Sequence, residues 1–275
     1  MVRTLIYKLV FFLITLPAFA AAKKDLSFWE MIAPPEDISE NGHLITWLFN
    51  YVTGANVFFM TLVILGIVVF SYLYSAKRHK KAYYTYGDKK AHILFVAACC
   101  LAVFLGIDMN ITRISNEDYT KVFNNPPDPK KEDVLRVEVL GQQWMWKFRY
   151  AGKDNIFNTA DDVVTLNDLR VPINKKVYFQ ITSKDVIHAF YVPNAKRKVD
   201  ALPGKITWMW TKFMKAGNWE IACAEMCGTH HYKMQAFLTT YNQEDFDNWY
   251  SNAQKYAELE NNPEDPTVFW GWKWY

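Results

Sequence analysis

The segment CAEMCGTHHYKM, residues 223–234, gathers several soft metal ligands into one short stretch of chain. Cys223 and Cys227 offer two thiolates, and His231 and Met234 add an imidazole and a thioether. Ligands of this kind favour copper over hard cations such as Mg²⁺ or Ca²⁺. A Cys-x3-Cys loop can bring both sulfurs to one point when it folds as a compact turn. The segment therefore predicts a copper site, with a disulfide between its two cysteines as the alternative.

The copper interpretation needs a second strong nitrogen ligand, and His188 is the upstream residue that could supply it. His188 comes just after VYFQITS, a stretch that alternates in the manner of a β-strand. Loops at the same end of a β-sandwich can meet, and such loops commonly carry binding residues. We therefore expect His188 to approach the cysteine segment in space.

The composition indicates a membrane part joined to an aromatic globular part. Of the 275 residues, 51% are hydrophobic, and the chain has 11 Trp, 16 Tyr and 19 Phe, which is rich for a soluble domain. The net charge of +3 is too small to indicate nucleic-acid binding. The four cysteines are fewer than a secreted disulfide scaffold of this length would carry. Cys99 and Cys100 lie in an apolar run and are interpreted as small buried residues.

The N-terminus has the pattern of a cleavable signal peptide over residues 1–22. Arg3 and Lys8 form a short basic region, an apolar stretch follows, and small residues of the A-x-A type end at Ala22. The apolar stretch is too short to span a bilayer, which favours a signal peptide over an anchor.

Two longer apolar stretches, at about residues 55–75 and 92–112, predict two transmembrane helices within residues 23–113. Each is near the roughly 20 residues that a helix needs to cross a bilayer. By the positive-inside rule, the basic loop between them is cytoplasmic, so the chain after the second helix lies on the outer side. The basic residues of this loop are Lys77, Arg78, Lys80, Lys81, Lys89 and Lys90.

A polar linker over residues 114–133 leads into a region, 134–242, that alternates with period two. Its clearest stretches are VLRVEVL, WMWKFRY, KKVYFQI, KITWMW and NWEIAC. Short alternating strands separated by polar turns predict an antiparallel sandwich or barrel. A helical pattern and an aromatic tail, TVFWGWKWY, complete residues 243–275. The outer side is oxidising, so two free thiols there would form a disulfide unless something held them apart.

The ligand spacing resembles that of cytochrome c oxidase subunit II, the subunit that carries the binuclear copper centre called CuA. The family pattern is Cys-x-Glu-x-Cys-x3-His-x2-Met, with an upstream Asp-Val-x-His. The run GQQWMWKFRY and the segment VDALPGK also match the family. The resemblance implies a membrane-anchored all-β protein, in which a two-helix transmembrane hairpin precedes a cupredoxin-like Greek-key β-sandwich. The matching positions are Cys223, Glu225, Cys227, His231 and Met234, after Asp185-Val186-Ile187-His188.

The resemblance also implies how a binuclear copper centre would be held. Cys223 and Cys227 would bridge the two copper ions through their thiolates. His188 would bind one copper and His231 the other. Met234 would be a weak axial ligand.

Further residues have implied roles with a plainer alternative. Glu225 would offer its backbone carbonyl to copper and its side chain to a Mg²⁺ site shared with subunit I, or it is a surface carboxylate. Trp144 would receive the electron from cytochrome c, or it is a core residue. His230 competes with the following histidine as ligand, although the spacing favours the latter. Asp185 and Asp200 could instead orient loops by accepting backbone hydrogen bonds.

The chain departs from the family in three ways. The family's glutamate at the second membrane helix has no counterpart, since no acidic residue lies between Asp88 and Asp108, and His92 is the one substitute. No C-x-x-C-H is present, so we expect no haem in this chain. From Ser115 onward, 20 Lys and Arg face 21 Asp and Glu, so no strong field would steer a basic cytochrome.

The resemblance implies the electron-transfer subunit of an aerobic respiratory oxidase, two-pass in a bacterial inner membrane, with the copper domain in the periplasm. It would accept electrons from a c-type cytochrome, tethered or complex-bound, and pass them to haem in subunit I, where oxygen is reduced and protons are pumped. The alternatives are the CuA subunit of a nitric oxide reductase and a membrane-anchored copper carrier. The aromatic tail is expected to pack on a neighbouring membrane subunit.

Overall fold

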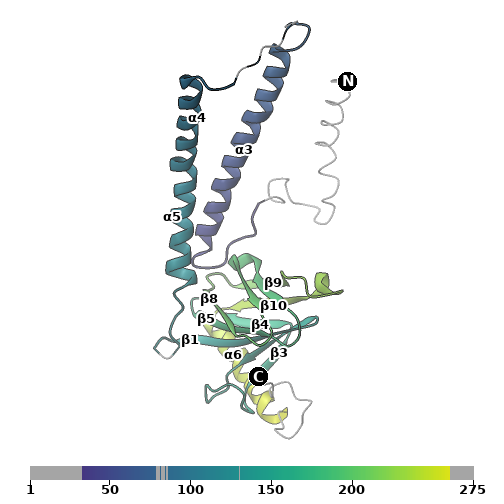
Figure 1. Ribbon diagram of the computed structural model, residues 1–275. Helices are drawn as coiled ribbons and strands as arrows, with labels where there is room; N and C mark the ends of the chain where they lie inside the picture. Colours follow the sequence, from purple (N-terminus) through teal and green to yellow (C-terminus); the bar gives the residue numbers. More distant parts are fainter. Residues whose placement is uncertain (1–32, 79–80, 82–83, 85, 130, 261–275) are drawn as a thin grey trace. The chain divides into compact units, whose positions relative to one another are not determined.

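The computed structural model describes residues 33–78, 81, 84, 86–129 and 131–260 (Figure 1). The predicted signal peptide and the aromatic tail TVFWGWKWY lie outside the described residues. What is described comprises two long apolar helices, a β domain and a C-terminal helix.

Both long helices are long and apolar enough to cross a membrane. Tyr51 Oη of the first donates a hydrogen bond to Gly106 O of the second, so the two helices contact each other. The first is α3 (Gly42–Leu73); the second runs without a break through α4 (Lys90–Val103), the π-helical turn η2 (Phe104–Asp108), α5 (Met109–Asp118) and a second π-helical turn, η3 (Tyr119–Phe123).

The helices extend beyond the apolar stretches that predicted them. The first begins at Gly42 rather than near residue 55, and the second continues to Phe123, into the predicted linker. High hydropathy identifies only the part of a helix that can lie in lipid. The helix itself can continue beyond that part where one of its faces packs against protein. Ile114 and Val122 lie on this extension and are buried. The non-helical linker therefore begins at Asn124.

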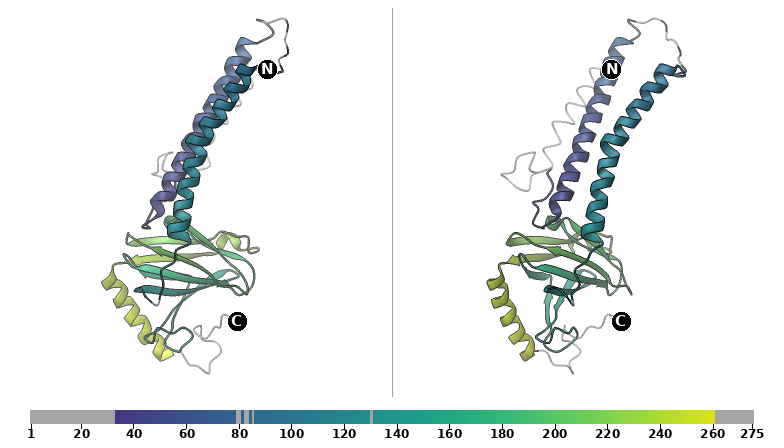
Figure 2. Two further views of the ribbon diagram at one scale, coloured as in Figure 1. Left: turned by 60° about the vertical axis from the view of Figure 1, so that its left-hand side comes forward. Right: turned by 90° about the vertical axis from the view of Figure 1, so that its left-hand side faces the viewer.

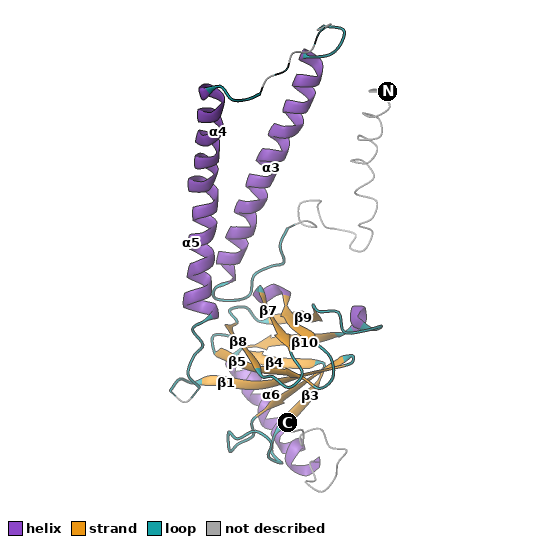
Figure 3. Ribbon diagram, in the orientation of Figure 1, coloured by secondary structure: helices purple, strands orange, loops and turns teal. Residues whose placement is uncertain are grey.

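The β domain is a sandwich of two five-stranded sheets, which confirms the predicted sandwich, although two of its strand pairs are parallel rather than antiparallel (Figure 3). One sheet has the order β3-β2-β1-β5-β8 and the other β4-β10-β9-β6-β7. The parallel pairs β1·β5 and β4·β10 join strands that are distant in the sequence, so the chain crosses between the sheets. The strands are β1 (Val134–Gln142), β2 (Met145–Tyr150), β3 (Val163–Leu166), β4 (Asp168–Pro172), β5 (Lys176–Ser183), β6 (His188–Val192), β7 (Arg197–Ala201), β8 (Thr207–Lys212), β9 (Gly217–Cys223) and β10 (Gln235–Tyr241).

Alternating residues of both sheets fill the space between them, as a half-buried strand pattern requires. Val137, Phe148 and Phe179 from one sheet and Phe190 and Ile221 from the other are fully buried. Short 3₁₀ turns, η4 (Pro193–Ala195) and η5 (His231–Lys233), connect strands of the second sheet.

The tryptophans of β8 share one face, as the alternation predicts, but that face points away from the inter-sheet core. Met209 pairs with Phe179 and occupies the core side. Trp210 Nε1–H donates to Val122 O at 2.7 Å, and the Trp208 ring centroid lies 6.1 Å from that of Phe123. Alternation shows which residues share a face of a strand but not what covers that face. The contact of these tryptophans with the end of the second long helix could therefore not be predicted from the sequence.

The C-terminal helix α6 (Gln243–Glu260) packs along one side of the sandwich (Figure 2). Asn242 Oδ1 accepts the backbone N–H of Asp245 at 2.9 Å and so caps the first turn. The Trp249 ring meets Tyr150 of β2 edge to face, with centroids 5.5 Å apart. Apolar residues on one face of the helix thus pack against the core of the sandwich.

Candidate metal centre

The cysteine segment is the loop between the antiparallel strands β9 and β10. Cys223 is the last residue of β9, and Met234 directly precedes β10. Cys223 N–H donates to Met234 O at 3.0 Å, which closes the loop at its base. His188 opens β6, the neighbour of β9 in the same sheet. The expected approach of His188 to the segment is therefore a direct result of strand pairing.

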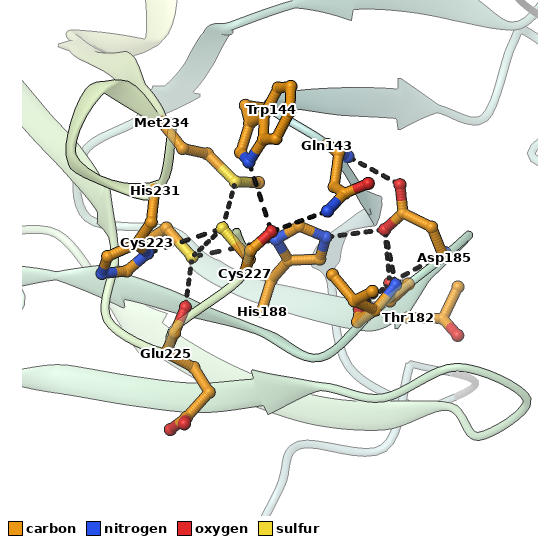
Figure 4. A network of polar contacts seen from close by, with 12 residues as sticks. Gln143, Trp144, Thr182, Asp185, His188, Cys223, Glu225, Cys227, His231 and Met234 are labelled. Atoms are coloured by element: carbon orange, nitrogen blue, oxygen red, sulfur yellow. Dashed lines mark hydrogen bonds and ion pairs between the residues drawn. The ribbon is translucent and has the colours of Figure 1, made fainter. Parts of the chain in front are cut away.

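Four of the predicted ligands meet in one buried cluster (Figure 4). Cys223 Sγ and Cys227 Sγ are 3.8 Å apart, and Met234 Sδ lies 3.7 Å from Cys227 Sγ. His188 Nδ1 lies 3.8 Å from Cys223 Sγ. His231 Nδ1, partly exposed, lies 3.5 Å from Cys227 Sγ. Each imidazole therefore faces a different sulfur.

The spacing of the two sulfurs fits a shared metal better than a disulfide. Cys223 and Cys227 are free thiols here, and 3.8 Å is far longer than the about 2.05 Å of an S–S bond. A soft ion bonded to thiolate at about 2.3 Å can contact both sulfurs at this separation. With two thiolates, two imidazoles and a thioether, the donor set is of the soft and intermediate kind that suits copper.

Glu225 presents its backbone rather than its side chain to the cluster. Its carbonyl oxygen lies 3.3 Å from Cys223 Sγ. Its carboxylate points away from the sulfurs and is exposed (Figure 4). The carbonyl and the carboxylate are thus available to two different partners.

The imidazole of His188 is held on its edge and on its face. Its Nε2 lies 2.8 Å from Asp185 Oδ1, which leaves Nδ1 directed at Cys223. The Trp146 ring approaches it edge to face with centroids 5.9 Å apart. A Cβ on Gly141 would come within 3.1 Å of His188 Cδ2, so a side chain at this position would crowd the ring. These contacts fix the tautomer and the orientation that a metal ligand requires.

His188 and Asp185 each stabilise the charged form of the other. Burial lowers the pKa of His188, but its hydrogen bonds to Cys223 and Asp185 outweigh burial and raise the pKa above its usual value. Burial raises the pKa of Asp185, but hydrogen bonds from Gln143 N–H and His188 prevail and lower it. The carboxylate is therefore ionised at neutral pH and attracts the imidazole.

The two thiols titrate as an unequal pair. Burial raises the pKa of Cys223, yet hydrogen bonds from His188 and from backbone near Glu225 outweigh it and bring the pKa down to about 6. Burial, followed by the charge of Cys223, raises the pKa of Cys227 to about 12. The site by itself favours one negative charge, and a bound cation is what would stabilise two thiolates together.

Trp144 belongs to the turn between β1 and β2, packs against the cysteine loop and is half-buried. Its Nε1–H donates to Cys227 O at 3.2 Å, and Gln143 Nε2–H donates to the same oxygen at 2.8 Å. The Trp144 ring centroid is 4.5 Å from that of His230. The indole therefore joins the protein surface to the backbone of one cysteine.

Two positioning contacts were only partly visible in the sequence. Asp185 accepts the backbone N–H groups of Gln143 and Val186 at 2.7 Å each, which confirms the prediction that it orients loops. The Asp200 carboxylate contacts Lys198 Nζ at 2.8 Å. The additional contact of Asp185 with the predicted ligand histidine was missed, although its spacing of three residues was a usable signal.

Comparison with known proteins gives a family for the β domain. Residues 135–240 match the family described as cytochrome C oxidase subunit II, periplasmic domain. The chain is 36% identical over 149 residues to an alternative cytochrome c oxidase subunit 2 of Bradyrhizobium diazoefficiens, covering 46% of this chain and 54% of that protein. It is also 36% identical over 137 residues to a heme-copper oxidase subunit 2 of Aeropyrum pernix, covering 49% of this chain and 56% of that protein.

The chain spans about half the length of the curated relatives it matches. Among solved structures, the periplasmic domain of subunit II of cytochrome oxidase of Bradyrhizobium japonicum aligns with a TM-score of 0.40 and 28% identity, over 44% of this chain and 94% of that domain. The family match encloses every residue of the cluster described above. Over residues 135–240, this chain is thus similar to the periplasmic domains of cytochrome c oxidase subunit II.

Proposed function

We propose that the chain is the electron-transfer subunit of a haem–copper terminal oxidase. It accepts electrons from a c-type cytochrome at a binuclear copper centre and passes them to haem in a partner chain, subunit I, where oxygen is reduced to water. The observation that carries this proposal is the buried meeting of His188, Cys223, Cys227 and Met234 within a domain of the subunit II family. When bound, the copper pair would supply one-electron oxidation and reduction.

The proposed ligand roles follow the contacts. Cys223 and Cys227 would hold copper through their thiolates, since their sulfurs lie 3.8 Å apart. His188, beside Cys223, and His231, beside Cys227, would each supply an imidazole. Met234 would supply a thioether beside Cys227. Glu225 contributes its carbonyl, and its exposed carboxylate is free to bind Mg²⁺ at the contact with subunit I.

The scaffold suits electron transfer because it keeps the ligands in place. Cys223 and His188 lie at the ends of paired strands, and both are buried. A rigid site limits rearrangement when the charge of the centre changes by one unit. The hydrophobic shell around the cluster, including Trp146, excludes water and helps to set the reduction potential.

Trp144 is the residue at which the electron enters in this proposal. It is half-exposed, and its N–H is bonded to Cys227 O at 3.2 Å, so it connects the surface with a bridging ligand. Because the outer domain is near neutral, we infer a tethered or complex-bound cytochrome as the donor. Reduction by a free cytochrome at the full native rate, with steep salt dependence, would argue against such a donor.

The proposed location is a bacterial inner membrane, with α3 and the second long helix spanning it and the β domain in the periplasm. The length and hydropathy of both helices, the basic loop between them and the periplasmic family of the β domain support this arrangement. Partner subunits would cover much of the exposed apolar surface of the two helices.

Copper content tests the proposal in the full chain purified in detergent. Two tightly bound copper ions with a mixed-valence EPR signal would support electron transfer. One labile Cu(I) would indicate a membrane-anchored copper carrier instead, and a Cys223–Cys227 disulfide in the native protein, detected by mass spectrometry, would exclude a copper site. Copurification with a nitric oxide reductase subunit rather than an oxidase subunit would assign the chain to that enzyme.

A further inference from the structure

Two adjacent histidines in the cysteine loop have different neighbours. His231 directs Nδ1 toward Cys227 Sγ at 3.5 Å. His230 is exposed, and its ring lies against Trp144, with centroids 4.5 Å apart and planes inclined by 40°. His230 O accepts the N–H of Lys233 at 2.9 Å, so the backbone at His230 is anchored as the start of the short turn η5. The imidazole on Trp144 is thus carried by an ordered turn.

The indole of Trp144 is restrained by the same loop at two other points. Its Nε1–H donates to Cys227 O at 3.2 Å. A Cβ on Gly228 would lie 3.4 Å from Trp144 Cζ2 and 3.5 Å from Nε1, so the bare glycine backbone forms one wall of the ring's site. The ring also packs against the hydrophobic core on its buried part, so the part that faces solvent is what remains to be covered. The imidazole of His230 provides that cover.

We propose that His230 is a positioning residue that holds the Trp144 indole on the Cys227 carbonyl. The inference rests on the proposed function, because it matters for electron transfer only if Trp144 is where the electron enters. Contact between two rings is worth enough to shift the closed population of an exposed indole by roughly twofold to tenfold. Loss of the His230 imidazole would therefore break the hydrogen bond from Trp144 Nε1–H to Cys227 O more often. While that bond is broken, the indole no longer connects the protein surface with the cysteine.

Hydrogen exchange of the indole N–H measures this opening directly. The full chain in detergent micelles would be labelled with ¹⁵N-tryptophan, and the resonance of Trp144 assigned by its loss in Trp144→Phe. We expect His230→Ala to accelerate exchange of this N–H by roughly twofold to tenfold. His230→Phe should restore the native rate, because a phenyl ring also packs on indole. Tyr232→Ala, in the exposed part of the same turn, should leave the rate unchanged.

Native exchange in His230→Ala would overturn the proposal, as would fast exchange in His230→Phe. Acceleration in Tyr232→Ala as well would overturn it too, because it would show a general loosening of the turn. The copper EPR signal, measured on the same variants, keeps the two hypotheses apart. If the native chain binds no copper pair, the proposed function fails, whereas the exchange rates still decide whether His230 holds the indole.

Discussion

Asp185 Oδ1 lies 2.8 Å from His188 Nε2, on the edge of the imidazole opposite the one that faces Cys223. The other oxygen of the same carboxylate accepts Gln143 N–H at 2.7 Å. Gln143 in turn donates from its side chain to Cys227 O. One carboxylate therefore joins a predicted ligand on β6 to the β1–β2 turn, and that turn to the cysteine loop.

Asp185→Asn is expected to weaken copper binding. Gln143 N–H, Val186 N–H and His188 Nε2 bond to this carboxylate through both of its oxygens, and an amide offers only one oxygen, so at least one of these hydrogen bonds must be lost. Removing such a partner of a ligand histidine typically lowers metal affinity by about 10- to 100-fold. Competition titration of the full chain with a copper chelator measures the change. Asp200→Asn, which alters only a surface contact with Lys198, is the control. Equal affinities in both variants would show that Asp185 does not support the ligand.

Gly228→Ala is expected to destabilise the cysteine loop more than a glycine substitution elsewhere. Gly228 has φ +114°, and a Cβ there would lie 3.0 Å from Gln143 Nε2, one of the donors to Cys227 O. Gly204 has φ +70° with open space around its Cβ position, so Gly204→Ala adds backbone strain alone. Such strain costs on the order of 1 kcal/mol, and Gly228→Ala should cost more. Thermal unfolding of the metal-free chain compares them, and equal losses would contradict the steric argument.

Local sequence patterns predicted the fold because each kind of secondary structure repeats its apolar residues at its own characteristic spacing. Alternation in VLRVEVL and KKVYFQI predicted β1 and β5, and their core residues Val137 and Phe179 are fully buried. The soft-ligand spacing of Cys223 and Cys227 marked the loop that gathers the cluster. Both signals lie within short segments, where side-chain direction follows directly from residue number.

Contacts between distant segments could not be predicted in this way. Gln143 and Asp185 are 42 residues apart, and only the parallel pairing of β1 with β5 brings their loops together. The contact of Trp144 with His230 likewise depends on how two loops meet. Trp210 was visible as a strand residue, but its partner, the backbone of Val122, offers no side-chain signal at all.

A buried group of charges makes the stability of the sandwich depend on pH. Arg149 contacts Glu138 through a short ion pair and lies 3.6 Å from Asp162, and all three side chains are buried. Burial outweighs the hydrogen bonds of Asp162 and raises its pKa to about 6. Since the folded form binds the proton more tightly than the unfolded chain, this residue stabilises the fold at low pH. That contribution is lost as the pH rises from about 4 to above 6.

Asp162→Asn should remove this part of the pH dependence. The amide oxygen can still accept from Asn158 N–H and Thr159 N–H, which the carboxylate accepts at 2.6 and 3.3 Å. Unfolding midpoints of the metal-free chain, measured between pH 4 and pH 7, should therefore change less with pH in the variant. Asp154→Asn, at an exposed position, should retain the native slope. A variant slope as steep as the native one would show that another group causes the dependence.

Substitution of each of the two neighbouring histidines should have a different effect on copper binding. His231 Nδ1 lies 3.5 Å from Cys227 Sγ, whereas the His230 ring packs on Trp144. His231→Ala should therefore abolish the mixed-valence EPR signal of the copper-loaded full chain, because one ion loses its only imidazole. His230→Ala should keep both copper ions and that signal. A signal that survives in His231→Ala and disappears in His230→Ala would reverse the assignment, and the loop would then have to rearrange on binding metal.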